Sequence, residues 1–154
     1  MSPVMLIVAY LLTSAAAGLF GGAAMELVMW LISRAGWAKG NMIVALGSLL
    51  TKSRDHAFRV GAILHIISAI GFAAVYVMLM LLLGLTHLPN SIMLGLGVGV
   101  FHGMLVSLML VWVVSESHPL EEFNEAGLAV GLSHFAGHVA FGAVVGLVVG
   151  LAPL

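Results

Sequence analysis

The amino-acid sequence predicts an all-α integral membrane protein, a bundle of four transmembrane helices with the N-terminus and the C-terminus on the outer side. Of its 154 residues, 62% are apolar and only 7% are charged, and the mean hydropathy is +1.22. A water-soluble domain carries about 25% charged residues, so this chain cannot cover a hydrated surface. The composition therefore excludes a nucleic-acid binder with a basic surface, and the absence of cysteine excludes disulfides and thiolate metal ligands.

Four apolar segments are long enough to cross a hydrocarbon core of about 30 Å, which takes roughly 20 helical residues. In chain order they are residues 4–33, 60–84, 91–115 and 126–151. No alternating strand pattern runs through the chain, and helices satisfy their own backbone in lipid, so we do not expect a barrel. The sequence predicts one transmembrane domain, residues 1–154, whose first helix is retained.

The basic residues set the predicted orientation. All of them lie between the first two spans, in residues 34–59; they are Arg34, Lys39, Lys52, Arg54 and Arg59. Basic residues in short loops mark the cytoplasmic side, which places this connection inside and residues 86–90 outside. Within the connection, residues 41–50 are apolar but too short to span, which predicts an interfacial helix. We expect a multi-pass protein of the inner cell membrane.

The second inner connection, residues 115–125, holds four of the six acidic residues and no basic residue. Carboxylates near the positive N-terminus of the last helix stabilise that helix, which is one interpretation of this loop. The other is a surface that docks a basic partner or attracts cations. In the cation interpretation His118, Glu121 and Glu122 guide an ion toward the membrane.

Five ionisable residues fall inside the predicted spans, where charge is costly and faces the bundle interior. They are Glu26 in the first span, His65 in the second, His102 in the third, and His134 and His138 in the fourth. At about 100° per residue, each shares a helical face with glycines, which allow membrane helices to pack closely. The predicted packing glycines are Gly18, Gly22, Gly95, Gly99, Gly127, Gly131 and Gly142. The sequence therefore predicts that these five ionisable residues form one cluster in the interior of the bundle.

The depths of these residues agree with a single site. At about 1.5 Å per residue, Glu26, His65 and His134 lie roughly 9–14 Å from the cytoplasmic helix ends, and His102 and His138 lie one turn deeper. A carboxylate with several imidazoles predicts a divalent transition-metal ion, with zinc or iron as the main candidates. Met29 and Ser68 lie on the same faces and are predicted to surround the ligands.

The metal can serve transport, sensing or redox chemistry, and the sequence leaves the choice open. Di-iron enzymes of the ferritin type need about four carboxylates, and no protease motif is present, so we do not expect an enzyme. Four helices leave little room for a permeation path. A homo-oligomer is therefore expected, paired through Gly18 and Gly22 or through Gly142, Gly146 and Gly150.

Four other interpretations stay open. His65 and His134 are suitable axial ligands for haem b. The Glu and His residues can also form a structural network or a proton relay, since histidine titrates near neutrality. A chain without an activity of its own can be a non-catalytic subunit or assembly factor of a larger membrane complex, with the glycine faces covered by a partner.

The order of these features resembles that of a known class of proteins. A glycine-rich first span with a polar residue is followed by a long basic loop, by Gly61-x-x-x-His65 and by the Gly-His-Val-Ala-Phe-Gly motif at residues 137–142. This pattern is similar to uncharacterised four-helix bacterial inner-membrane families of the YagU type. The resemblance implies a four-helix inner-membrane fold and no settled biochemical activity.

Overall fold

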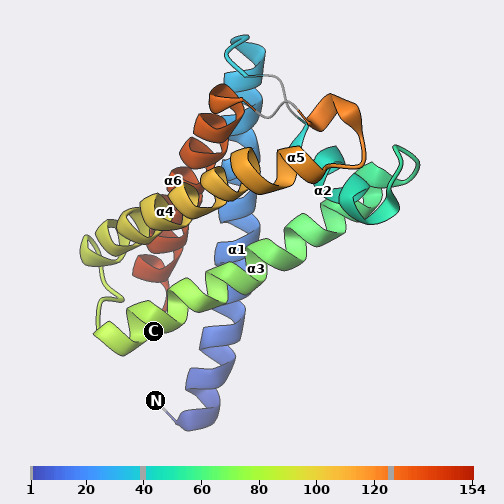
Figure 1. Cartoon of the computed structure of the whole chain (residues 1–154). Helices are drawn as coiled ribbons and strands as arrows, with labels where there is room; N and C mark the ends of the chain where they lie inside the picture. Colours follow the sequence, from blue (N-terminus) through green and yellow to red (C-terminus); the bar gives the residue numbers. More distant parts are fainter. Residues whose placement is uncertain (1, 39–40, 125–126) are drawn as a thin grey trace.

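A computed structural model describes residues 2–38, 41–124 and 127–154 (Figure 1). Its helices are α1 (Pro3–Arg34), α2 (Met42–Thr51), α3 (Ala57–Leu83), α4 (Asn90–Met109), α5 (Ser115–Ser117) and α6 (Leu128–Leu151). A π-helical turn, Leu110–Val114, joins α4 to α5, and a 3-10 turn, Glu121–Phe123, precedes α6. No strand occurs in these described ranges, so the predicted all-α class is confirmed.

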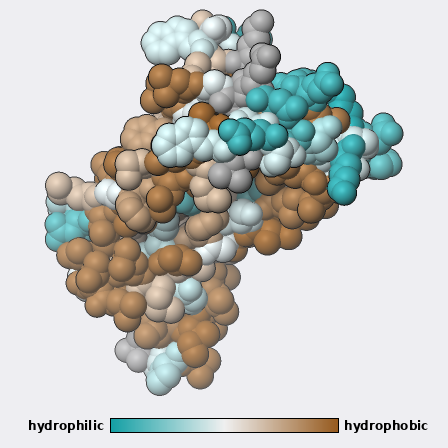
Figure 2. Space-filling view, in the orientation of Figure 1, coloured by the Kyte–Doolittle hydropathy of each residue, from teal (hydrophilic) through white to brown (hydrophobic). Residues whose placement is uncertain are grey.

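Four helices in the described part of the chain are long and apolar enough to cross a membrane. They are α1, α3, the continuous helix Asn90–Ser117 and α6, as expected from the apolar segments. Figure 2 shows hydrophobic residues over the long helices and hydrophilic residues gathered near α2 and α5. Length and composition therefore suit a multi-pass membrane protein. The predicted start of the last span at residue 126, together with Lys39 and Glu125, lies outside the described residues.

The four long helices do not contact one another equally. α6 packs closely against α4 and α1, and α1 also packs against α3, whereas α3 has few contacts with α4 or α6. Figure 1 shows α3 passing across α1 and α4 lying along α6. The bundle is thus a tight α4–α6 pair joined through α1 to α3.

Glycines bring α4 and α6 together. Gly95 of α4 meets Gly142 and Gly146 of α6, and a Cβ on Gly99 would lie 2.8 Å from the carbonyl oxygen of His138. On α1, a Cβ on Gly18 would lie 2.6 Å from the Cα of Ile70 on α3. Small residues therefore set these two crossings, as membrane helix packing requires.

Two expectations about glycine are wrong. Gly127 precedes α6 and has no neighbouring heavy atom within 4 Å of a Cβ placed on it, so it packs against no helix. The faces expected to pair two copies are covered inside one chain: Gly18 contacts α3, and Gly150 contacts Leu88 and Ser91 before and in α4. A dimer must use another surface, because a packed glycine face is no longer available to a second copy.

The short helix α2 forms close to the interfacial segment expected from the sequence. The side chain of Asn41 accepts a hydrogen bond from the Val44 backbone N–H at 3.1 Å and so caps its start. Gly47 of α2 faces the backbone of Ala57 and Gly61 at the start of α3. This close contact fixes α2 to α3 and leaves its other side to face α4 and α6.

Candidate functional site

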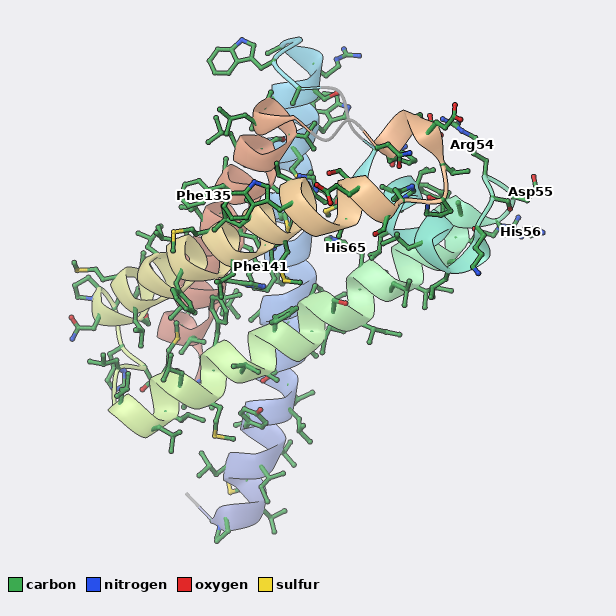
Figure 3. The ribbon with its side chains drawn as sticks, viewed as in Figure 1. Arg54, Asp55, His56, His65, Phe135 and Phe141 are labelled. Carbon is green, nitrogen blue, oxygen red and sulfur yellow. The ribbon has the colours of Figure 1, made fainter. Side chains whose placement is uncertain are left out.

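Glu26 and His65 meet where α1 crosses α3. The carboxylate Oε1 of Glu26 lies 3.4 Å from Nε2 of His65, and Figure 3 labels His65 on α3 near this crossing. Gly22, one turn before Glu26, faces α3 here: a Cβ on it would lie 3.3 Å from the Cβ of Ala69 and 3.7 Å, an ordinary contact, from the same ring nitrogen. Both atoms are buried and neither has a hydrogen-bond partner. At this crossing the carboxylate and the imidazole therefore lie within ion-pair distance, but no hydrogen bond joins them.

The two histidines of α6 are held by their own helix. Nδ1 of His134 donates to the Val130 carbonyl oxygen at 2.9 Å, and Nδ1 of His138 donates to the His134 carbonyl oxygen at 2.8 Å. A carbonyl can only accept, so in a neutral ring the lone pair lies on Nε2. Nε2 of His134 is buried without a partner. Backbone-bound Nδ1 with a free Nε2 is the arrangement typical of metal-ligating histidines.

His102 of α4 is surrounded by aromatic rings. Its Nδ1 lies 3.2 Å from the hydroxyl of Tyr76, and its ring centroid is 4.3 Å from that of Phe72 and 4.6 Å from that of His138. The Nε2 atom of His102 is also buried without a partner. Sequence reasoning missed Tyr76, although a buried tyrosine in an apolar helix requires a partner for its hydroxyl.

Four of the five residues form two side-chain pairs, Glu26 with His65 and His102 with His138. His65 interacts electrostatically with His134 and His138, and His138 does so with His102. Over residues 2–38, 41–124 and 127–154, however, no three His, Asp or Glu side chains lie close enough to share one metal ion. The tight cluster expected from the helical faces is therefore not assembled. Helical faces do not fix the distances between helices, and α3 has few contacts with α4 or α6.

The residues expected around the ligands have different surroundings. Met29 is buried and lines a small space beside Ser133 and His134. Ser68 is exposed on α3. The inner-loop residue Glu121 is also exposed. Of these side chains, Met29 alone shares a space with a predicted ligand.

The other two inner-loop residues connect the loop to the α2–α3 region. His118 is buried; its Nδ1 accepts from the Leu120 N–H at 3.1 Å, and its Nε2 donates to the Ala45 carbonyl oxygen of α2 at 3.1 Å. Glu122 pairs through both carboxylate oxygens with Arg54, which follows α2. Both interactions hold the loop before α6 against the α2 end of the molecule.

The Arg54–Glu122 pair changes the proton affinity of the loop carboxylate. The hydrogen bond from the guanidinium holds the pKa of Glu122 below its ordinary value, and the pKa of Arg54 is raised by the same bond. Both side chains are exposed to solvent, which screens the pair, so it fixes position more than it adds stability. Its charges cancel, which leaves the acidic character of the described loop to Glu116 and Glu121.

A cavity of about 330 Å³ lies between α2 on one side and α4, the π-helical turn and α6 on the other. His118 and Glu122 line it near the loop, and His134 lines it from α6. Most of the remaining wall is aliphatic. No sequence pattern indicates this cavity, because it depends on how α2 is placed against helices far away in the chain.

No protein-family model matches this chain, and no curated protein or solved structure matches it. The resemblance to four-helix inner-membrane families of the YagU type therefore stays a prediction.

Proposed function

We propose that this protein binds a divalent transition-metal ion inside the membrane through Glu26, His65, His102, His134 and His138. One observation carries the proposal: three ring nitrogens, the Nε2 atoms of His65, His102 and His134, are buried without hydrogen-bond partners, as is Oε1 of Glu26. A buried polar atom left unpaired costs about 1–3 kcal/mol. A metal ion that accepts lone pairs from these atoms removes that cost.

The donor set supports a borderline metal. Imidazole and carboxylate suit zinc, iron, cobalt and nickel, and no thiolate is present for softer ions. Nδ1 of His134 and of His138 is already bonded to backbone, so each ring keeps its orientation when Nε2 binds. Binding requires the Glu26–His65 pair to move toward α6, since no three described ligands share one ion position.

We further propose that the ion is carried across the inner membrane rather than used in catalysis. The five ligand candidates come from all four long helices and lie inside helices that are suited to cross a membrane. An ion held at helix crossings is released when those crossings shift. A homo-oligomer or a larger membrane complex would supply the remaining walls of a path.

The decisive experiment is a metal titration of the purified full-length protein in detergent, using Zn²⁺ and Fe²⁺ followed by calorimetry and elemental analysis. We expect one ion per chain. His134→Ala is expected to weaken binding by more than about 100-fold, because loss of an outer-shell partner alone costs about 10–100-fold. His87→Ala is the matched control, since His87 is an exposed histidine outside the site, and it should bind like wild type.

Two outcomes contradict the proposal. The first is wild-type protein that binds neither ion, or that binds equally well after His134→Ala and His65→Ala. The second is a Soret absorption band in protein purified from native membranes, which indicates haem b in place of a metal ion.

A further inference from the structure

We propose that the cavity between α2 and the α4–α6 pair binds a small, neutral, apolar molecule. The proposal goes beyond metal binding and does not depend on it. At about 330 Å³, the cavity falls at the lower end of the range of roughly 300–1,000 Å³ found for small-molecule sites. It suits one ring system or a short hydrocarbon chain, and it is too small for a whole phospholipid.

The walls come from three parts of the chain and are largely hydrocarbon. The apolar residues are Met42, Ala45, Leu46 and Leu49 of α2, Val106 and Met109 of α4, Leu110 and Val114 of the π-helical turn, Phe123 of the 3-10 turn, and Val130 of α6. An apolar enclosure offers water too few hydrogen-bond partners, so it favours an apolar occupant. The two methionines add flexible side chains that adapt to the shape of a ligand.

Most polar side chains in the wall are already engaged, which argues against a charged ligand; the oxygen of Asn41 accepts from the Val44 N–H. Ser115 donates its hydroxyl to the Val111 carbonyl oxygen at 2.6 Å, and both ring nitrogens of His118 are bonded. Glu122 is neutralised by Arg54. An ionic group entering this space would lose its hydration without gaining a partner, which is strongly unfavourable. The chemistry of the wall therefore selects a neutral molecule.

His134 is the wall residue that keeps an unpaired polar atom, and that atom is not open to the cavity. Its Nδ1 is bonded to Val130, and its Nε2 is buried. The imidazole thus separates the cavity from the proposed metal ligands. The cavity and the proposed metal site share His134 but otherwise use different helices. Residues of α2 line only the cavity, whereas Glu26 of α1 and His65 of α3 belong only to the proposed metal site.

The frame around the cavity is fixed at both sides. Gly47 and Gly61 hold α2 against α3, and the bond from His118 to Ala45 and the Arg54–Glu122 pair hold the loop before α6 against the α2 end. These contacts fix the positions of α2 and of the loop, so the cavity is preformed, which is the usual condition of small-molecule pockets.

The test is photolabelling of the full-length protein in lipid nanodiscs with a neutral alkylbenzene that carries a diazirine, followed by mass spectrometry. We expect labelling of α2 and of residues 106–114 that saturates and is suppressed by an excess of the unlabelled alkylbenzene. Labelling at Met93, which is 68% exposed on α4, should increase linearly with concentration, because it reports contact from the lipid.

Substitutions separate the cavity from the surrounding lipid. Leu46→Trp fills the cavity and is expected to reduce the saturable labelling at least tenfold, and the smaller change Ala45→Leu should reduce it in the same direction. Leu50→Trp is the matched control on α2, since Leu50 is 65% exposed and lines no part of the cavity. Equal labelling of the Leu46→Trp, Ala45→Leu and Leu50→Trp proteins overturns the proposal.

Two further measurements complete the test. A probe of the same size that carries a carboxylate should label the cavity weakly. If it labels the cavity as strongly as the neutral probe does, the site binds an anionic amphiphile, and the inference is contradicted. His65→Ala should abolish metal binding and leave saturable labelling intact. Failure of the metal proposal and failure of the cavity proposal are thus observed separately.

Discussion

Individual buried side chains support the proposed metal site. Glu26, His65, His102 and His134 each hold a polar atom that is buried without a hydrogen bond, in a chain with very few charges. Unsatisfied buried groups are rare in folded proteins and indicate strain, catalysis or an ion. The residues expected from the sequence to matter most are therefore also the residues whose environment is incomplete.

The Tyr76 hydroxyl is expected to stabilise the fold through His102. Tyr76→Phe removes the hydrogen bond to Nδ1 of His102 while it keeps the ring packing against Phe141. The free energy of unfolding should fall by about 1 kcal/mol, the usual contribution of one such bond. Unfolding in mixed detergent micelles measures this change. A Tyr76→Phe variant as stable as wild type would contradict the prediction.

Among the elements, the α4–α6 pair has the most extensive contact. Gly99→Ala should destabilise it by about 1–3 kcal/mol, because the new methyl group would lie 2.8 Å from the His138 carbonyl oxygen and must push the helices apart. Gly97→Ala on the same helix is the control, since its methyl group meets nothing within 4 Å. Thermal unfolding compares the two; similar melting temperatures would show that the crossing is not tight.

The loop before α6 is expected to loosen in acid. The pKa of Glu122 is lowered in the folded chain by its hydrogen bond with Arg54. The ionised carboxylate therefore stabilises the loop fully above pH 4.5, the ordinary pKa, and this stabilisation is lost as the pH falls through the lowered pKa of the folded chain. Hydrogen exchange of residues 118–124 should therefore increase below about pH 4.5. In Glu122→Gln this exchange should already be fast at neutral pH, while Glu121→Gln should behave like wild type.

At the scale of the whole molecule, the sequence predicts that residues 34–59 lie inside the cell and both termini outside. The chain contains no cysteine, so single cysteines can be introduced without background. Ser53→Cys should resist a membrane-impermeant maleimide applied to intact cells, and His87→Cys should react with it. Labelling in the opposite sense would reverse the orientation and would place the proposed metal site nearer the outer surface.

The sequence by itself determined the class of the protein and the identity of the candidate ligands. Hydropathy and length predict the long helices because the hydrocarbon core of a membrane requires both. An ionisable residue inside such a helix is rare, so the sequence alone identifies it as a candidate site residue. The glycine pattern likewise predicted most of the packing faces, since close helix contact in lipid requires small residues. These properties depend only on short segments of the chain and on the hydrocarbon interior of the membrane that surrounds them.

Tertiary structure decided what the chain alone could not. α3 has few contacts with α4 or α6, so Glu26 pairs with His65 and His102 packs on His138 without an assembled site. The placement of α2 against α4 and α6 creates the cavity, and the long-range pair of Arg54 with Glu122 neutralises part of an acidic loop. Each of these features joins segments far apart in the sequence, where local periodicity holds no information about distance.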